Sequence, residues 1–160
     1  MGRKPSLEDA GEPLDTLVVS GNAGKELARV VKRDVWGAAL AALEEAELVH
    51  ADLHPGNVCI RERDGKLEAL VVDLEGAVKE GSKLEESPIK YRDELLNESS
   101  NTASTKMDKA WVAAILQCLW EEGSFHDLVK GVRGLKNLSH AEFKERTEDI
   151  LCKIVPSGRS

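Results

Sequence analysis

The segment HADLHPGN, His50 to Asn57, lies between a strongly helical pattern and two β-like runs. Two histidines, an aspartate and an asparagine fall within this short stretch, and the Pro55-Gly56 pair predicts a turn among them. Side chains able to bind metals or move protons, gathered at a turn between regular elements, mark the segment as a candidate functional loop.

Two interpretations follow from the loop alone. His50, Asp52 and His54 alternate along the chain, so an extended strand would place them on one face as ligands for zinc or a similar metal. The Pro-Gly turn directly after His54 disfavours a long strand there. The plainer interpretation is a polar turn, because Asp and Asn side chains hydrogen-bond to their own backbone.

A long helix is predicted before the loop, over residues 24–47. Trp36 and Leu40 lie off its main apolar stripe, which predicts burial on more than one side. The glycine-rich start, residues 21–26, has the Gly-Lys pair of a phosphate loop but the wrong glycine spacing, so we interpret it as a loop at the helix start. The stripe itself consists of Leu27, Val30, Val31, Val35, Ala38, Ala42, Leu43 and Ala46.

After the loop, residues 58–73 form two β-rich runs around Asp64-Gly65, which predicts a hairpin. Residues 74–106 are polar with weak apolar periodicity and predict a mobile loop, with room for a short helix at 91–96. Residues 107–155 predict a helical tail. Three pairs in or just before this tail have capping-box spacing: Thr105/Asp108, Ser124/Asp127 and Ser139/Glu142.

Composition indicates a single globular domain spanning residues 1–160, with 41% hydrophobic and 32% charged residues. A formal net charge of −7, spread along the chain, argues against nucleic acid or an anionic membrane as a partner. The three cysteines are far apart and form no CxxC pair, which favours reduced thiols and a cytoplasmic location. No apolar run is long enough to span a bilayer.

Phosphoryl transfer needs hard oxygen ligands for Mg²⁺ and a carboxylate that orients the attacking hydroxyl. The chain has His50-Ala51-Asp52, then Asn57 five residues after the aspartate, then Asp73 in VVDLEGA at the end of the hairpin. This order resembles the protein-kinase-like phosphotransferase superfamily. Within it, the residues of these motifs look more like those of the atypical and aminoglycoside- or choline-kinase-like branches than those of the regulated protein kinases. The stretch Met107 to Trp111, MDKAW, resembles the start of a later helix of the same fold.

The resemblance implies a mainly α-helical fold with a small β-hairpin (α+β), equivalent to the C-terminal lobe of a kinase. It implies ATP and Mg²⁺ as cofactors, with Asp52 orienting the acceptor hydroxyl and Asn57 and Asp73 as metal ligands. His54 would steady the transferred phosphoryl group, or else be a solvent-facing turn residue. Three further roles follow from the family: His50 as a brace near the Asp73 turn, Asp108 as a hydrogen-bond acceptor for the catalytic-loop backbone, and Cys59 near the floor of the adenine pocket or in the core.

The sequence departs from the family at its start. Residues 6–14 resemble the inter-lobe hinge, where the Glu8 and Ala10 backbone would meet adenine, and no glycine-rich loop or phosphate-anchoring lysine precedes them. We therefore expect the N-terminal lobe to be missing, and the isolated chain to be weakly active or inactive. Its expected partners are a nucleotide, a hydroxyl acceptor and a separate N-lobe. The alternatives are a pseudokinase-like interaction module and, with less support, the HxDxH metal protein.

Overall fold

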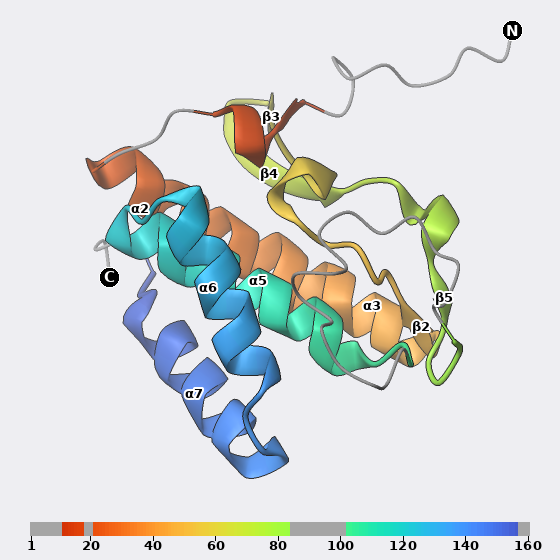
Figure 1. Cartoon of the computed structure of the whole chain (residues 1–160). Helices are drawn as coiled ribbons and strands as arrows, with labels where there is room; N and C mark the ends of the chain where they lie inside the picture. The colour runs from red at the N-terminus through yellow and green to blue at the C-terminus, as the bar shows by residue number, and fades with distance from the viewer. Residues whose placement is uncertain (1–10, 18–20, 84–101, 157–160) are drawn as a thin grey trace, which may run out of the picture.

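A small sheet lies on one side of a group of packed helices in the computed structural model, which describes residues 11–17, 21–83 and 102–156 (Figure 1). A long helical run comes first and consists of α2 (Gly21–Val31), a π-helical segment (Lys32–Ala39) and α3 (Leu40–Glu45). The helix predicted over 24–47 is therefore confirmed, but residues 21–26 are helical rather than a loop. Mixed α+β architecture, mainly helical, is what the sequence predicted.

The π-helical segment shifts the buried face of this run. The Leu40 amide donates to the Val35 carbonyl five residues earlier, where an α-helix would bond four residues back. Val35 and Leu40 are both buried, whereas Ala38, Ala42 and Ala46 are exposed. Beyond Val35 the predicted apolar stripe is therefore wrong at its three alanines, because the wider turn rotates the following residues relative to α-helical spacing, whereas Leu43 packs partly buried against the core.

The larger sheet is antiparallel, with strand order β1–β3–β4. β3 (Val58–Arg63) and β4 (Lys66–Val71) form the predicted hairpin, and β1 (Glu12–Pro13) adds to the other edge of β3. Asp64 and Gly65 have φ angles of 55° and 77°, the positive values that a type I′ turn requires. The hairpin prediction is confirmed. β1 was not predicted, because a strand of two residues is too short to show an alternating apolar and polar pattern.

A second, two-stranded sheet pairs β2 (Leu48–Val49) with β5 (Val78–Lys79). Further along, the Gly81 amide donates to the Ala103 carbonyl, and the Ala103 amide donates to the Ser82 carbonyl, each at 2.8 Å. The two ends of the loop predicted over 74–106 thus contain short regular elements, namely a 3-10 turn (Leu74–Gly76), β5, a bridge between Lys83 and Thr102, and the first residues of α5. The short helix expected at 91–96 lies outside the described residues.

The helical tail consists of α5 (Thr105–Glu121), α6 (Phe125–Lys136) and α7 (His140–Lys153). α5 is buried on nearly all sides, between the α2 run and α6, and supplies much of the core. Capping boxes are present at Ser124/Asp127 and Ser139/Glu142, as predicted. The predicted Thr105/Asp108 box is wrong: the N-cap of α5 is Ser104, which forms no side-chain cap bond, and the Asp108 carboxylate points elsewhere.

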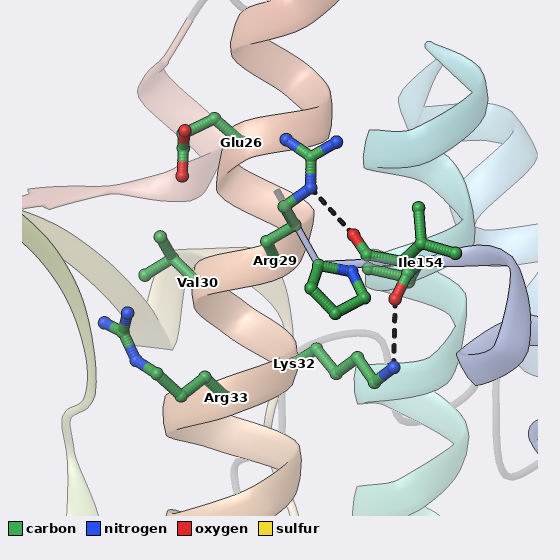
Figure 2. Close-up of a pocket in the computed structure, with 8 residues that line it drawn as sticks. Glu26, Arg29, Val30, Lys32, Arg33 and Ile154 are labelled. Carbon is green, nitrogen blue, oxygen red and sulfur yellow. Dashed lines mark hydrogen bonds between the residues drawn. The ribbon is translucent and has the colours of Figure 1, made fainter. Parts of the chain in front are cut away.

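Cations on α2 and at the start of the π-helical segment bind carbonyl groups at the ends of the other helices. Lys25 Nζ donates to the Trp120 carbonyl of α5 at 3.1 Å. Lys32 Nζ donates to the Leu151 and Ile154 carbonyls at 2.9 Å, and Arg29 Nε donates to the Val155 carbonyl at 2.8 Å (Figure 2). Because helix C-termini carry unsatisfied carbonyls and partial negative charge, these cations hold α5 and α7 to α2.

The outer edge of β4 is closed by an ion pair from the helical run. Arg33 binds Asp34 through Nε at 2.7 Å and donates from Nη2 to the Leu67 carbonyl at 2.8 Å, while Asp34 Oδ2 accepts from the Ala69 amide at 2.9 Å. The hydrogen bond from Arg33 holds the pKa of Asp34 below its ordinary value; burial opposes this and the Ala69 amide adds to it. The ion pair thus satisfies the Leu67 carbonyl and the Ala69 amide of β4, which a neighbouring strand would otherwise bind.

Within the described ranges, no helix combines the length and apolar character needed to cross a membrane.

Gly24 tests the close packing of α2 on α5. A Cβ atom there would lie 2.7 Å from the Leu119 carbonyl oxygen, so Gly24→Ala should lower the free energy of unfolding by about 1–3 kcal/mol. Gly134→Ala on α6 is the matched control, because its Cβ would enter open space. That change should raise the free energy of unfolding by about 0.5–1 kcal/mol. Urea denaturation measures both, and equal effects of the two changes would contradict the close approach.

Substitution of Asp34 tests the Arg33–Asp34 ion pair at the outer edge of β4, which we call the edge clamp, and the pH dependence of its stabilising effect. Asp34→Asn should lower the free energy of unfolding by about 1–2 kcal/mol at neutral pH, because it weakens charge-assisted hydrogen bonds. Since the folded-state pKa of Asp34 is lowered, this stabilisation is present above the unfolded pKa of about 3.9 and is lost as pH falls through the folded value. Urea titrations of both proteins across the acid range should therefore converge; Glu44→Gln, in an exposed pair with Lys109, should change little.

Candidate functional site

The loop from His50 to Asn57 is anchored by a buried carboxylate from α5. Asp108 Oδ2 accepts from the His50 amide at 2.8 Å, and Oδ1 accepts from the Ala51 amide at 3.0 Å. Asp108 is only 2% exposed, and burial raises the pKa of its carboxyl group, although both amide bonds favour the charged form. This is the contact with the loop backbone that the sequence analysis expected of Asp108.

Ala51 shows why the loop needs this anchor. Its φ angle is 74°, a left-handed conformation that costs a non-glycine residue about 1 kcal/mol or more. The Asp108 bonds fix the two peptide groups before the Ala51 Cα, and the Asp52 amide that follows donates to His50 Nδ1. Below it, a small apolar cluster joins β2, the loop, β5 and the start of α5, and consists of Val49, Ala51, Ala103, Met107 and Val78.

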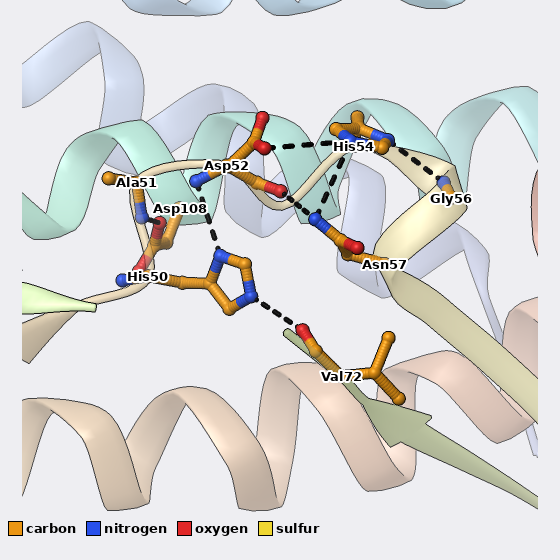
Figure 3. A network of polar contacts seen from close by, with 8 residues as sticks. All are labelled: His50, Ala51, Asp52, His54, Gly56, Asn57, Val72 and Asp108. Atoms are coloured by element: carbon orange, nitrogen blue, oxygen red, sulfur yellow. Dashed lines mark hydrogen bonds and ion pairs between the residues drawn. The ribbon is translucent and has the colours of Figure 1, made fainter. Parts of the chain in front are cut away.

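His50 connects the loop to the end of the hairpin (Figure 3). Its Nδ1 accepts from the Asp52 amide at 3.2 Å, which leaves the ring proton on Nε2, facing the Val72 carbonyl at 2.8 Å. The ring is 2% exposed. Val72 directly precedes Asp73, so His50 ties the two segments that carry the candidate carboxylates, in the position expected for a brace.

Asp52, His54 and Asn57 face one another across the turn (Figure 3). Asn57 Nδ2 donates to the Asp52 carbonyl at 2.7 Å. His54 Nδ1 accepts from the Gly56 amide at 3.0 Å, so its Nε2 is turned toward Asp52 Oδ2, 3.7 Å away. The His54 ring is buried against the edge of Trp111, which rules out the solvent-facing turn residue considered from the sequence.

Asp73 reaches the same end of the hairpin from β4. The Val72 amide donates to the Asn57 carbonyl at 3.0 Å, which places Asp73 one residue beyond the residue paired with Asn57. Asp73 is exposed, has a φ angle of 62° and ψ of 46°, and its side chain does not cap the turn that follows. The backbone of Asp73 is thus fixed while its carboxylate faces solvent.

Two residues with hard oxygen donors, Asn57 and Asp73, therefore have neighbouring backbone positions at this end of the hairpin. Since the amide nitrogen of Asn57 is used inside the loop, its Oδ1 is the atom suited to a cation, and Asp73 adds a charged carboxylate. Mg²⁺ is commonly held by one or two carboxylates together with substrate phosphates and water, so the donor set fits that ion when a nucleotide completes it.

The geometry of the loop does not support a metal site formed by His50, Asp52 and His54. Both ring nitrogens of His50 are occupied by hydrogen bonds within the loop and to β4. Among residues 11–17, 21–83 and 102–156, no group of three or more His, Cys, Asp or Glu side chains is arranged to hold a metal ion. The alternating histidines do not share a face, because the chain turns at Ala51 and Pro55.

Cys59 lies inside β3 opposite Leu70 and is fully buried. Burial raises the pKa of its thiol, and the charge of Asp15 adds to this. The side chain reaches no accessible surface, so the structure favours the core interpretation of Cys59 over a place on an adenine pocket. Glu8 and Ala10, expected to meet adenine through their backbone, lie outside the described residues.

Asp15 is a neighbour of the loop that the sequence did not reveal. It lies in a 3-10 turn (Leu14–Thr16), and a Cβ atom built on Gly56 would lie 2.9 Å from its Oδ2 and 2.7 Å from His54 Cε1. Close packing against His54 and Asp15 therefore favours glycine at position 56. No spacing within the sequence links Asp15 to a loop some forty residues later, and only the pairing of β1 with β3 brings it there.

No protein-family model matches the chain, and no curated protein matches it. The assignment of a function therefore depends on the residues and the geometry described above.

Asp108→Ala tests the anchor. The change leaves two buried amide donors without an acceptor, so the free energy of unfolding should fall by about 2–4 kcal/mol. Asp108→Asn keeps one acceptor oxygen and should give an intermediate loss. Urea denaturation measures both, with Lys109→Ala as the control on the exposed side of α5, where a surface ion pair contributes little. Wild-type stability in Asp108→Ala would contradict the anchoring role.

Proposed function

We propose that this chain is the C-lobe part of a kinase-like phosphotransferase, which binds Mg²⁺ and a nucleotide at the loop and hairpin end and transfers the γ-phosphoryl group to a hydroxyl. The observation that carries the proposal is the joint bracing of the loop and the hairpin end by Asp108 and His50. His50 and Asn57 both bind the backbone of Val72, the residue before Asp73, which supports a shared site for Asp52, Asn57 and Asp73 in the order of the resemblance.

Asp52 is the residue placed to act on the acceptor. Its carboxylate lies beside His54 Nε2, and its backbone is held on both sides, by His50 and by Asn57. In the proposed reaction the acceptor oxygen forms a bond to the γ-phosphorus, the bond from that phosphorus to the β–γ bridging oxygen breaks, and the hydroxyl proton passes to Asp52. The nucleoside diphosphate leaves with the bridging oxygen.

Asn57 Oδ1 and Asp73 are the groups that would hold Mg²⁺. When bound, the ion would neutralise charge on the nucleotide phosphates. His54 is oriented by the Gly56 amide and by Trp111, and its Nε2 lies on the Asp52 side of the turn, where a donor could contact the transferred group. His54 thus fits a positioning role beside Asp52.

In the proposed enzyme an N-lobe would supply the remaining nucleotide contacts, a glycine-rich loop and an anchoring lysine. Catalysis in this class depends mostly on positioning and charge neutralisation, so the chain alone should bind Mg²⁺–nucleotide weakly and turn it over slowly or not at all. The pseudokinase-like alternative predicts nucleotide binding without turnover even when an N-lobe is supplied.

Mn²⁺ in place of Mg²⁺ tests the metal ligands directly. In ¹⁵N-labelled protein with ADP present, trace Mn²⁺ should broaden amide signals of residues 56–57 and 72–74 more than those of α7. Asp73→Asn should abolish the selective broadening, because it removes the exposed carboxylate while keeping a residue type that tolerates the left-handed conformation. Asp149→Asn, an exposed aspartate on α7, is the matched control and should leave the pattern unchanged.

Thermal unfolding supplies the second readout. Mg²⁺–ATP should raise the melting temperature of the wild type and of Asp149→Asn, but not of Asp73→Asn, since ligands stabilise the state that binds them. Absence of both the broadening and the melting shift, even with an N-lobe added, would overturn the proposed function.

A further inference from the structure

A pocket separate from the loop lies between α2 and the end of α7 (Figure 2). Its volume is about 400 Å³, and it shares no lining residue with residues 50–57. One wall is a single face of α2, at helical spacing, and the other is the chain that follows α7. We call it the α2–α7 pocket; the lining residues that matter here are Glu26, Arg29, Val30, Arg33, Ile154 and Val155.

The walls of this pocket are fixed in place. Lys32 donates to the Leu151 and Ile154 carbonyls, and Arg29 Nε donates to the Val155 carbonyl, so the end of α7 is bound to α2 at three points. Val30 and Ile154 are 2% and 1% exposed and belong to the core. A pocket built on core residues is preformed, which lowers the entropic cost of binding a ligand.

The charge around the pocket is opposite to that of the whole chain. Three cations and one carboxylate line it, in a protein of net charge −7. Arg33 is paired with Asp34. Lys32 binds carbonyl oxygens, and Arg29 binds the Val155 carbonyl and lies over the Trp120 ring, 5.6 Å from its centroid; neither has a carboxylate partner in the described part of the chain. Figure 2 shows the terminal nitrogens of Arg29 directed away from the Val155 carbonyl, where they can bind an anion with both donors.

The rest of the lining limits what that anion can be. Ile154, Val155 and Pro156 give the pocket an apolar side, and Val155 is 50% exposed, so a ligand could cover it. Glu26 adds one negative charge to the lining, which disfavours a dianion such as phosphate. We propose that the α2–α7 pocket binds a small carboxylate with an apolar body, its head on Arg29 and its body against Val155 and Pro156.

Isothermal titration of the full chain with sodium octanoate tests this site. We expect one molecule bound per chain, with affinity at least about tenfold higher than for octanamide, which has the same body but no charge. Acetate, which has the head without the body, should also bind at least about tenfold more weakly, because it buries little apolar surface. Equal affinity for octanoate and octanamide would overturn the anion site, as would absence of octanoate binding.

Two substitutions test separately the contacts made by the carboxylate head and by the apolar body of the ligand. Arg29→Gln should weaken octanoate binding about tenfold or more, while Arg146→Gln, which lines a different groove between α5, α6 and α7, should not change it. Val155→Asp places a repelling carboxylate on a half-exposed position and should also abolish binding without disturbing the core. If Arg29→Gln does not fold, Val155→Asp decides alone; wild-type affinity in a folded variant of either kind would overturn the proposal.

Discussion

The buried carboxylate of Asp108 is the constraint on which the loop depends. Its two oxygens accept hydrogen bonds from the amides of His50 and Ala51. These bonds offset the energetic cost of the left-handed conformation of Ala51. That bend directs His50 inward toward Val72 and leaves Asp52 at the turn. A single buried acceptor on α5 therefore fixes the bend from which His50 and Asp52 extend.

The hairpin extends this constraint to the second half of the site. Its I′ turn at Asp64-Gly65 sets the register of β3 and β4, and that register brings Val72 opposite Asn57. A slip of one residue would turn Asp73 to the other face of the sheet and move it away from the loop. The edge clamp of Arg33 and Asp34 protects the same register from the helical side, because it binds Leu67 and Ala69 of β4.

Local chemistry explains which features could be predicted from the sequence. The Asp-Gly turn, two serine capping boxes and the long helix depend on residues close in the chain, so their patterns are visible there. The π-helical segment, the β1 pairing and the place of Asp15 depend on contacts between distant residues. Thr105/Asp108 has the spacing of a capping box, but the two loop amides provide more partners for the carboxylate than the helix start does.

α5 and α2 together connect the loop of residues 50–57, near the start of α5, with the α2–α7 pocket, near its end. Near its start α5 holds the loop through Asp108, and near its end it is held by Lys25 of α2, which binds the Trp120 carbonyl. The cations one and two turns further along α2 then fix the end of α7. The Gly24-Lys25 pair, which resembles part of a phosphate loop in sequence, thus has a packing role: glycine admits the α5 backbone and lysine binds its carbonyl. Since α5 is buried along its length and bonded at both ends, it is a rigid support that positions the loop and the α2–α7 pocket while allowing each to bind its own ligand.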